Sequence, residues 1–222
     1  MSRGDQIGAN LAAVRERIRR AGGDPDAVTV VGVTKGQSPD ACLAAVDAGL
    51  TILGENRVQE ALAKMDVVPG AEWHLVGHLQ TNKVRHAGRF ALVQSVDSVR
   101  LAEALAARAG VPALLEVNVA REERKHGVAP GQAVDVAVRV AALLDLRGLM
   151  GMGPAAGDPR PAFAELRRLR DEAEQRLGRR LPVLSMGMSE DLEAAVAEGT
   201  TMVRVGRALF GPRRDRPGAV VS

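Results

Sequence analysis

Lys35 is the residue of this sequence best placed for covalent chemistry. It closes the short apolar run VTVVGVTK, and the polar loop GQSPD follows at once. Runs of this kind form strands that are buried on both faces of a parallel sheet. In a parallel barrel the active site lies at the carboxyl ends of the strands, where a partly dehydrated amine can attack an aldehyde to form a Schiff base. The alternative is a surface lysine that ends a strand.

Two loops late in the chain have the composition of an anion site. The segment LSMGMSEDLEAA carries Ser185 and Ser189, and MVRVGRALFG turns at Gly206 and continues with Arg207. Exposed N–H groups and the helix dipole favour an anion at a helix N-terminus. Loops after the seventh and eighth strands of a (β/α)₈ barrel often bind phosphate. The two loops therefore predict a phosphate site, and the alternative is helix capping by Ser189 and a turn at Gly206.

Arg204 lies inside the apolar run of the last expected strand. A guanidinium buried in a barrel needs a partner, because an unpaired buried charge is costly. A bound cofactor would supply one partner. A carboxylate on a neighbouring strand, such as Glu116, would supply another, and the sequence alone leaves both interpretations open.

Further polar residues follow the second and third expected strands. Asn56 either caps a helix or faces the mouth of the barrel. His74 and His78 lie four residues apart, which is the spacing of metal ligands on a helix. However, WHLVGHLQTNKV has the pattern of a strand followed by a loop, and no third ligand follows at a suitable spacing. We therefore predict no zinc site.

The elements that must position these residues alternate along the chain. After an amphipathic helix over 7–21, strands are expected near 28–35, 51–54, 73–76, 91–95, 113–119, 146–150, 182–186 and 201–205. Helices are expected over 39–48, 56–65, 80–87, 98–109, 130–143, 160–177 and 189–198, with a short one after Gly206. This α/β alternation predicts a (β/α)₈ TIM-type barrel with an extra N-terminal helix, and a doubly wound open sheet is the alternative. We expect a single domain over 1–222, with 212–222 as a flexible tail.

Composition narrows the function classes. Hydrophobic residues make up 46% and charged residues 26% of the 222 residues, as in a globular protein. No apolar run reaches the roughly 20 residues of a membrane helix, and the N-terminus lacks the pattern of a secretory signal. A single cysteine, Cys42, fits a reducing cytoplasm. Three Phe, one Trp and no Tyr leave little for stacking on nucleic acid.

Taken together, these segments resemble the pyridoxal 5′-phosphate homeostasis proteins, whose barrel is that of the N-terminal domain of alanine racemase. The resemblance rests on VVGVTK, GENRVQEAL, WHLVGHLQTNK, QSVDS, VNVAREERKHG, LRGLMGMGP, LSMGMSEDLEAAVAEGTTMVRVG and ALFG, which span nearly the whole chain in the right order. The segments GMSEDLEAA and WHLVGHLQTNK are particularly specific.

The resemblance implies pyridoxal 5′-phosphate as cofactor and a role for each candidate residue. Lys35 is expected to carry the cofactor as an internal aldimine. Ser189, Gly206 and the backbone that follows are expected to bind its phosphate. Arg204 should lie near the pyridine nitrogen, and Asn56 near the ring.

The chain also departs from the family pattern. Many members have Thr-Lys-Pro after the Schiff-base lysine, whereas this chain has Gly36, Gln37 and Ser38, so the second lysine is absent. After Gly206 the family often has Thr or Ser, and this chain has Arg207. Its side chain either replaces the lost hydroxyl contact with charge or turns outward and leaves only its backbone N–H at the phosphate.

The resemblance favours a carrier over an enzyme. A racemase of this kind needs a second base opposite the lysine, which is a tyrosine in alanine racemase, and this chain has no tyrosine. An arginine beside the pyridine nitrogen opposes its protonation and weakens the ring as an electron sink. We therefore expect a cytoplasmic, monomeric carrier that serves pyridoxal phosphate-dependent apo-enzymes and binds neither nucleic acid nor membrane. A weak amino-acid racemase or Schiff-base lyase is the alternative, and a basic nucleic-acid-binding module is a more remote one.

Overall fold

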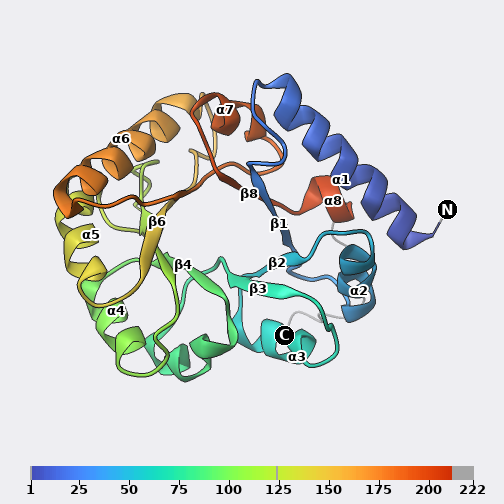
Figure 1. Ribbon diagram of the computed structural model, residues 1–222, viewed down its shortest axis with the longest axis horizontal. Coiled ribbons are helices and arrows are strands. Elements are labelled where there is room, and N and C mark those ends of the chain that lie inside the picture. Colours follow the sequence, from blue (N-terminus) through green and yellow to red (C-terminus); the bar gives the residue numbers. More distant parts are fainter. Residues whose placement is uncertain (1, 124, 212–222) are drawn as a thin grey trace, which may run out of the picture.

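The computed structural model describes residues 2–123 and 125–211, and within these ranges eight parallel strands close into a barrel (Figure 1). Each strand pairs with the next along the chain, and β8 returns to β1. The strands are β1 (Thr29–Val33), β2 (Ile52–Glu55), β3 (Glu72–Leu75), β4 (Leu92–Val96), β5 (Ala113–Val117), β6 (Leu146–Gly151), β7 (Val183–Ser185) and β8 (Met202–Val205).

The helices surround the barrel as an outer ring (Figure 1). They are α1 (Arg3–Arg20), α2 (Pro39–Asp47), α3 (Val58–Met65), α4 (Val99–Ala106), α5 (Ala133–Ala141), α6 (Arg160–Leu177), α7 (Leu192–Ala197) and α8 (Arg207–Phe210), with 3₁₀ segments η1 (Thr81–Arg89) and η2 (Pro130–Gln132).

The predicted barrel and its extra N-terminal helix are confirmed. The alternative of an open sheet is wrong, because four consecutive residues of β1, beginning with Thr29, pair in register with four of β8, beginning with Met202. The expected tail over 212–222 lies outside the described residues.

Three of the predicted helices differ in form or length. The segment expected as a helix over 80–87 is a 3₁₀ helix, whose buried residues Val84 and Ala87 lie three apart, as that helix type requires. The segment expected over 130–143 begins as a 3₁₀ turn at Pro130 before α5. The segment expected over 189–198 becomes helical only at Leu192, because Ser189 and the two residues after it form a turn.

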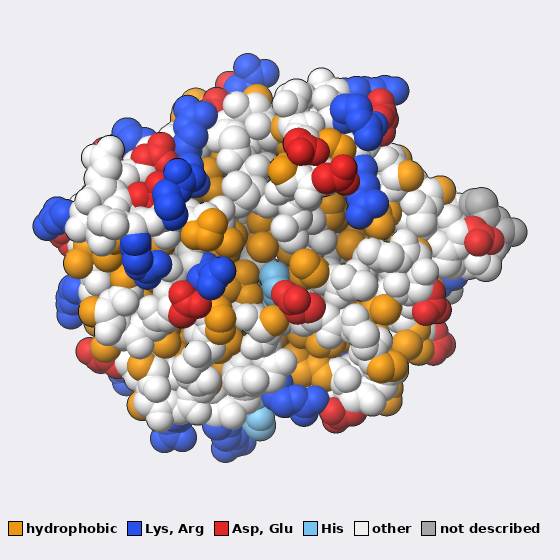
Figure 2. Space-filling view, in the orientation of Figure 1, with side chains coloured by type: hydrophobic (Ala, Val, Ile, Leu, Met, Phe, Trp, Pro, Cys, Tyr) orange, Lys and Arg blue, Asp and Glu red, His pale blue; other side chains and the backbone are white. Residues whose placement is uncertain are grey.

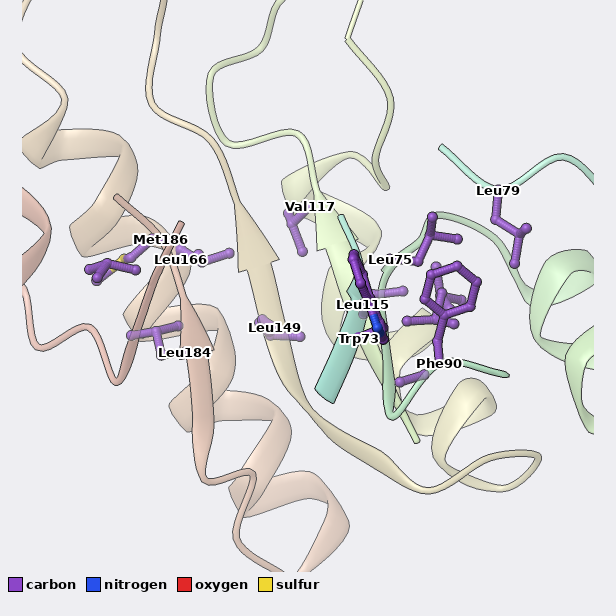
Figure 3. Close-up of a cluster of buried hydrophobic side chains, with 14 of the residues drawn as sticks. Trp73, Leu75, Leu79, Phe90, Leu115, Val117, Leu149, Leu166, Leu184 and Met186 are labelled. Carbon is purple, nitrogen blue, oxygen red and sulfur yellow. The ribbon is translucent and has the colours of Figure 1, made fainter. Parts of the chain in front are cut away.

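The apolar core lies mainly between the barrel and its helices. Trp73, Leu75 and Leu115 project from the strands into this layer (Figure 3). Phe90 lies near Leu75, and Leu166 of α6 lies beside Leu184 and Met186. A smaller apolar cluster fills part of the interior of the barrel and consists of Val31, Leu92, Leu114, Met150 and Met202. The two clusters follow from the alternation of side chains along each strand, which places successive residues on opposite faces.

Candidate functional site

Strand register brings three of the expected site residues, Lys35, Asn56 and Gly206, to one end of the barrel. Val33 of β1 pairs with Gly54 of β2, so Lys35 and Asn56 each lie two residues beyond a paired position. On the other side of β1, residue 32 pairs with residue 205, which places Gly206 beside Val33. A Cβ on Gly206 would stand 3.3 Å from the carbonyl oxygen of Val33. Residues 29–56 and 202–206 thus supply one end of the barrel with an amine, an amide and a close backbone approach.

Lys35 is held by contacts to the residues on either side of it. It is half-buried in the turn that follows β1. The carbonyl oxygen of Thr34 accepts a hydrogen bond from Lys64 Nζ at 2.8 Å, and the backbone N–H of Gly36 donates to Glu60 at 2.6 Å. Both partners belong to α3, so this helix sets the position of the turn that presents Lys35.

A buried ion pair anchors α3 to the barrel at this point. Lys64 and Glu55 are 4% and 0% exposed, and Glu55 Oε1 accepts hydrogen bonds from Lys64 Nζ and from the Thr34 hydroxyl. Burial raises the pKa of Glu55 and outweighs the opposing effect of Lys64. The residue patterns considered above gave no role to Lys64. In the sequence, its burial is indicated by its place on the apolar face of α3, four residues after Glu60.

Arg204 lies inside the barrel, 5% exposed, and its protein partners are neutral groups in place of the expected Glu116 carboxylate. Its guanidinium donates to the Ser185 hydroxyl at 2.6 Å and to the carbonyl oxygen of Gly151 at 2.9 Å. No direct ion pair with Glu116 is formed in the described part of the chain, although that carboxylate acts on it through space. Burial lowers the pKa of Arg204 to about 10, so the group stays charged at neutral pH.

Ser185 connects Arg204 to a chain of hydrogen bonds across the barrel interior. The Ser185 hydroxyl donates to Gln94 at 2.7 Å, and the Gln94 amide donates to Nδ1 of His74 at 3.0 Å. His74 Nε2 then donates to Glu72 at the amino end of β3. Burial lowers the pKa of His74 and so favours its neutral form. Figure 2 shows acidic and basic side chains spread over this face of the molecule, with a histidine visible near its centre.

Glu116 is a second buried titratable group inside the barrel. It is 4% exposed on β5. Burial and the nearby Asp97 carboxylate raise its pKa to about 7, against the opposing effect of Arg204. The charge in this region therefore changes near neutral pH.

Ser189 makes a contact that sequence reasoning did not identify. The expected capping of its own helix is wrong, because α7 begins after Asp191 and has no side-chain cap. The Ser189 hydroxyl instead accepts a hydrogen bond from the backbone N–H of Ala208 at 3.3 Å. The hydroxyl therefore lies at the N-terminus of α8, beside the turn at Gly206.

The two remaining expectations concern Arg207 and Asn56. The exposed Arg207 side chain pairs with Glu190 at 2.6 Å. It therefore turns outward, which is one of the two arrangements expected from the sequence. Asn56 is half-buried and does not cap α3, whose N-cap is Arg57.

Comparisons with known proteins decide the family. Residues 3–214 match the family model "Alanine racemase, N-terminal domain". The pyridoxal phosphate homeostasis protein of Aquifex aeolicus is 39% identical over 92% of this chain and 97% of its own length. That of Pseudomonas aeruginosa is 42% identical over 93% and 96%. The chain belongs to the pyridoxal phosphate homeostasis protein family.

Two solved structures share this barrel. PipY of Synechococcus elongatus, with pyridoxal phosphate bound, aligns with a TM-score of 0.82 and 37% identity over 93% of this chain and all of its own. Alanine racemase of Corynebacterium glutamicum aligns with a TM-score of 0.75 and 16% identity over 93% of this chain and 60% of its own, a likeness of fold alone. No helix in the described part of the chain is long and apolar enough to cross a membrane.

Proposed function

We propose that this member of the family binds pyridoxal 5′-phosphate and serves its homeostasis by holding and delivering it. The names of its relatives and the cofactor bound to PipY support this function. The observation that carries the proposal is the register of β8, β1 and β2. It gathers Lys35, Asn56 and Gly206 at one end of the barrel, beside the donors of α8.

The donor set fits this cofactor. Its phosphate needs hydrogen-bond donors, and the Ser189 hydroxyl and the N-terminal N–H groups of α8 lie together. Its pyridine nitrogen accepts a hydrogen bond when unprotonated, and Arg204 is a buried donor that stays charged at neutral pH. The cofactor supplies an aldehyde that condenses with a lysine amine. In this proposal Lys35 provides the amine and Asn56 lies beside the ring.

The same residues favour storage over turnover. A charged Arg204 at the pyridine nitrogen would hold that nitrogen unprotonated, and the chain contains no tyrosine to act as the second base of a racemase. We therefore propose a monomeric carrier without racemase or lyase activity, whose recipients are apo-enzymes that use this cofactor.

Absorbance and peptide mapping test the proposal. Adding pyridoxal phosphate should give a visible band, and borohydride reduction followed by proteolysis should place the label on Lys35. Lys35→Ala should remove both, whereas Lys83→Ala serves as the matched control and should keep both. A label that falls mainly on Lys64, Lys83 or Lys125 contradicts the assignment.

Incubation with amino acids tests the carrier role separately. The loaded protein should leave the chirality and amount of each amino acid unchanged while it restores activity to a pyridoxal phosphate-dependent apo-enzyme. Sustained turnover of an amino acid would support the alternative, a weak racemase or Schiff-base lyase.

A further inference from the structure

Three side chains with metal-ligand chemistry meet in loops at the carboxyl ends of β3, β4 and β5. They are His78, Asp97 and His126, and one ligand atom from each lies within 4.8 Å of the other two. His78 Nδ1 stands 3.1 Å from Asp97 Oδ2, and His126 Nδ1 stands 3.9 Å from the same oxygen. His74, which the sequence pairs with His78, points into the barrel interior instead.

The backbone fixes two of these residues through neighbouring glycines. Gly77 packs so closely on Asn56 that a Cβ there would stand 2.3 Å from the Asn56 carbonyl oxygen, and its own carbonyl accepts a hydrogen bond from Ser95 at 2.7 Å. Gly127 has a φ of +113°, and a Cβ there would stand 2.7 Å from the Asn118 nitrogen. His78 follows Gly77 and His126 precedes Gly127, so the backbone next to each histidine is held in a fixed conformation.

The loop that carries His126 is also tied back to its strand. Val128 forms an isolated bridge with Val117 of β5, and its N–H donates to the carbonyl of Glu116 at 2.8 Å. A ligand nine residues beyond the strand is thereby returned to the end of the barrel. A backbone that is already held in place lowers part of the entropy cost of binding, although the ring itself still has to turn.

Asp97 has the surroundings of a ligand carboxylate. The hydroxyl of Ser98 donates to Oδ1 at 3.2 Å, which leaves Oδ2 facing the two histidines. Such outer contacts orient metal-ligating carboxylates. Asp97 also raises the pKa of the buried Glu116. Two carboxyl groups thus act on each other here, and a bound cation would offset their repulsion.

We propose that His78, Asp97 and His126 bind a divalent transition-metal ion of the zinc class. Two imidazole nitrogens and one carboxylate oxygen are a ligand set that such ions accept, with the remaining positions left to water. This site lies on different strands from the proposed cofactor site and goes beyond the function proposed above. It differs from the sequence-based prediction of no zinc site, because its ligands come from three loops and not from the pair His74 and His78.

The arrangement of the rings makes the proposal specific. The rings of His78 and His126 stack with centroids 4.0 Å apart and planes 11° apart. Nitrogen lone pairs lie in the ring plane, so two parallel rings cannot aim at one ion. Binding must therefore tilt a ring, and His126, with 58% of its side chain exposed against 37% for His78, has the room to turn.

Calorimetric titration with Zn²⁺ at a mildly alkaline pH tests the site. Protein stripped of pyridoxal phosphate should bind one ion per chain. His126→Ala and Asp97→Asn should each weaken Zn²⁺ binding by at least about tenfold. Loss of a residue that only orients a metal ligand already weakens binding by about that factor, so loss of a ligand should cost at least as much. His86→Ala is the matched control, because His86 is a half-buried histidine on η1 outside the cluster, and the variant should bind as the unaltered protein does.

Ring-proton resonances give a second readout. Of the four histidines, those of His78 and His126 should shift as their stack opens, while His74 and His86 stay unchanged. The proposal is overturned if no stoichiometric binding occurs, if Asp97→Asn and His126→Ala bind normally, or if His86→Ala is equally impaired. Because the titration uses cofactor-free protein, its failure would leave the proposed function standing, and a failed borohydride mapping would leave the metal site standing.

Discussion

At the scale of single residues, the barrel interior contains a carboxyl group whose charge changes near neutral pH. Glu116 lies in reach of the fields of Asp97 and Arg204, and its carboxyl has a pKa of about 7. An acid whose pKa is raised on folding binds more protons in the folded state than in the unfolded state. Its contribution to stability is therefore present below the unfolded pKa of about 4.5 and is lost as the pH rises through about 7.

Glu116→Gln should remove this pH dependence. The variant should gain about 1–3 kcal/mol in free energy of unfolding near pH 8 and little near pH 5, because the amide has no charge to desolvate. Urea titrations at both pH values measure the difference. Glu103→Gln, an exposed substitution on α4, is the control and should behave alike at both. A gain for Glu116→Gln that is equal at both pH values would contradict the titration.

Ser189→Ala tests the proposed phosphate site. A charge-assisted hydrogen bond contributes about 1.5–3 kcal/mol, so loss of the hydroxyl should weaken pyridoxal phosphate binding by roughly tenfold or more. Unphosphorylated pyridoxal should bind almost as before, since under the proposal it would reach only Lys35 and the residues around the ring. Equal losses for both ligands in fluorescence titrations would mean that Ser189 acts through its contact with Ala208 and local stability.

Arg207→Thr is a companion test. The Arg207 side chain pairs with Glu190 in an exposed position, and exposed ion pairs contribute little. The substitution should change pyridoxal phosphate affinity and its salt dependence only slightly. A clear loss of salt sensitivity would show that the guanidinium reaches the phosphate.

At the scale of elements, helices outside the barrel hold the loops of the candidate site. The extra helix α1 contacts both late loops. Arg17 donates to the carbonyl of Ser189 at 2.9 Å and pairs with Glu193 of α7, while Asn10 donates to the carbonyl of Leu209 in α8 at 2.8 Å. This helix, which adds nothing to the sheet, thus fastens α7 and α8 to one another.

Arg17→Ala should therefore affect the phosphate loop from outside. We expect pyridoxal phosphate to bind about two- to tenfold more weakly, the effect of one hydrogen bond of about 0.5–1.5 kcal/mol on the loop. Arg20 lies on the same helix and, in the described structure, pairs only with Glu16. The control variant Arg20→Ala should therefore bind pyridoxal phosphate normally. Loss of affinity in both variants, measured by fluorescence titration, would point to a general weakening of α1.

The contact between α3 and the turn that carries Lys35 depends on the buried ion pair of Glu55 and Lys64. Lys64→Met leaves a buried carboxylate without its cation and should cost about 3–5 kcal/mol in free energy of unfolding. The double variant Glu55→Leu, Lys64→Met should recover a large part of that loss, because the uncompensated charge is gone. Chemical denaturation measures all three proteins, and a double variant no more stable than Lys64→Met alone would contradict this account.

At the scale of the whole molecule, the closed barrel should respond to ligand as one unit. Pyridoxal phosphate at a hundred times its dissociation constant should raise the free energy of unfolding by about 2.7 kcal/mol. The increase should disappear in Lys35→Ala if the covalent link carries most of the affinity. Light scattering should give a mass near the chain's 23.4 kDa with and without cofactor. A mass twice as large would contradict the proposed monomer.

Local patterns in the sequence are enough to predict the kinds of element and their order. The run that ends at Lys35, the turns after it and the later strand–helix units are local patterns, and they predicted a barrel whose closure the structure confirms. Regular spacing specifies local structure because hydrogen bonding and side-chain alternation act over a few residues. Predictions from spacing were wrong where a turn forms in place of the first turn of a helix, as at Ser189, and where a 3₁₀ helix forms in place of an α-helix, as in η1.

Which side chains meet depends on how the whole chain folds. Ser189 contacts Ala208, Lys64 becomes buried against Glu55, and His78 meets Asp97 in place of its sequence neighbour His74. Each of these pairs joins different elements, so its distance depends on strand register and barrel closure. Period and composition do not encode that register one residue at a time, because it results from packing the whole ring of helices against eight strands at once.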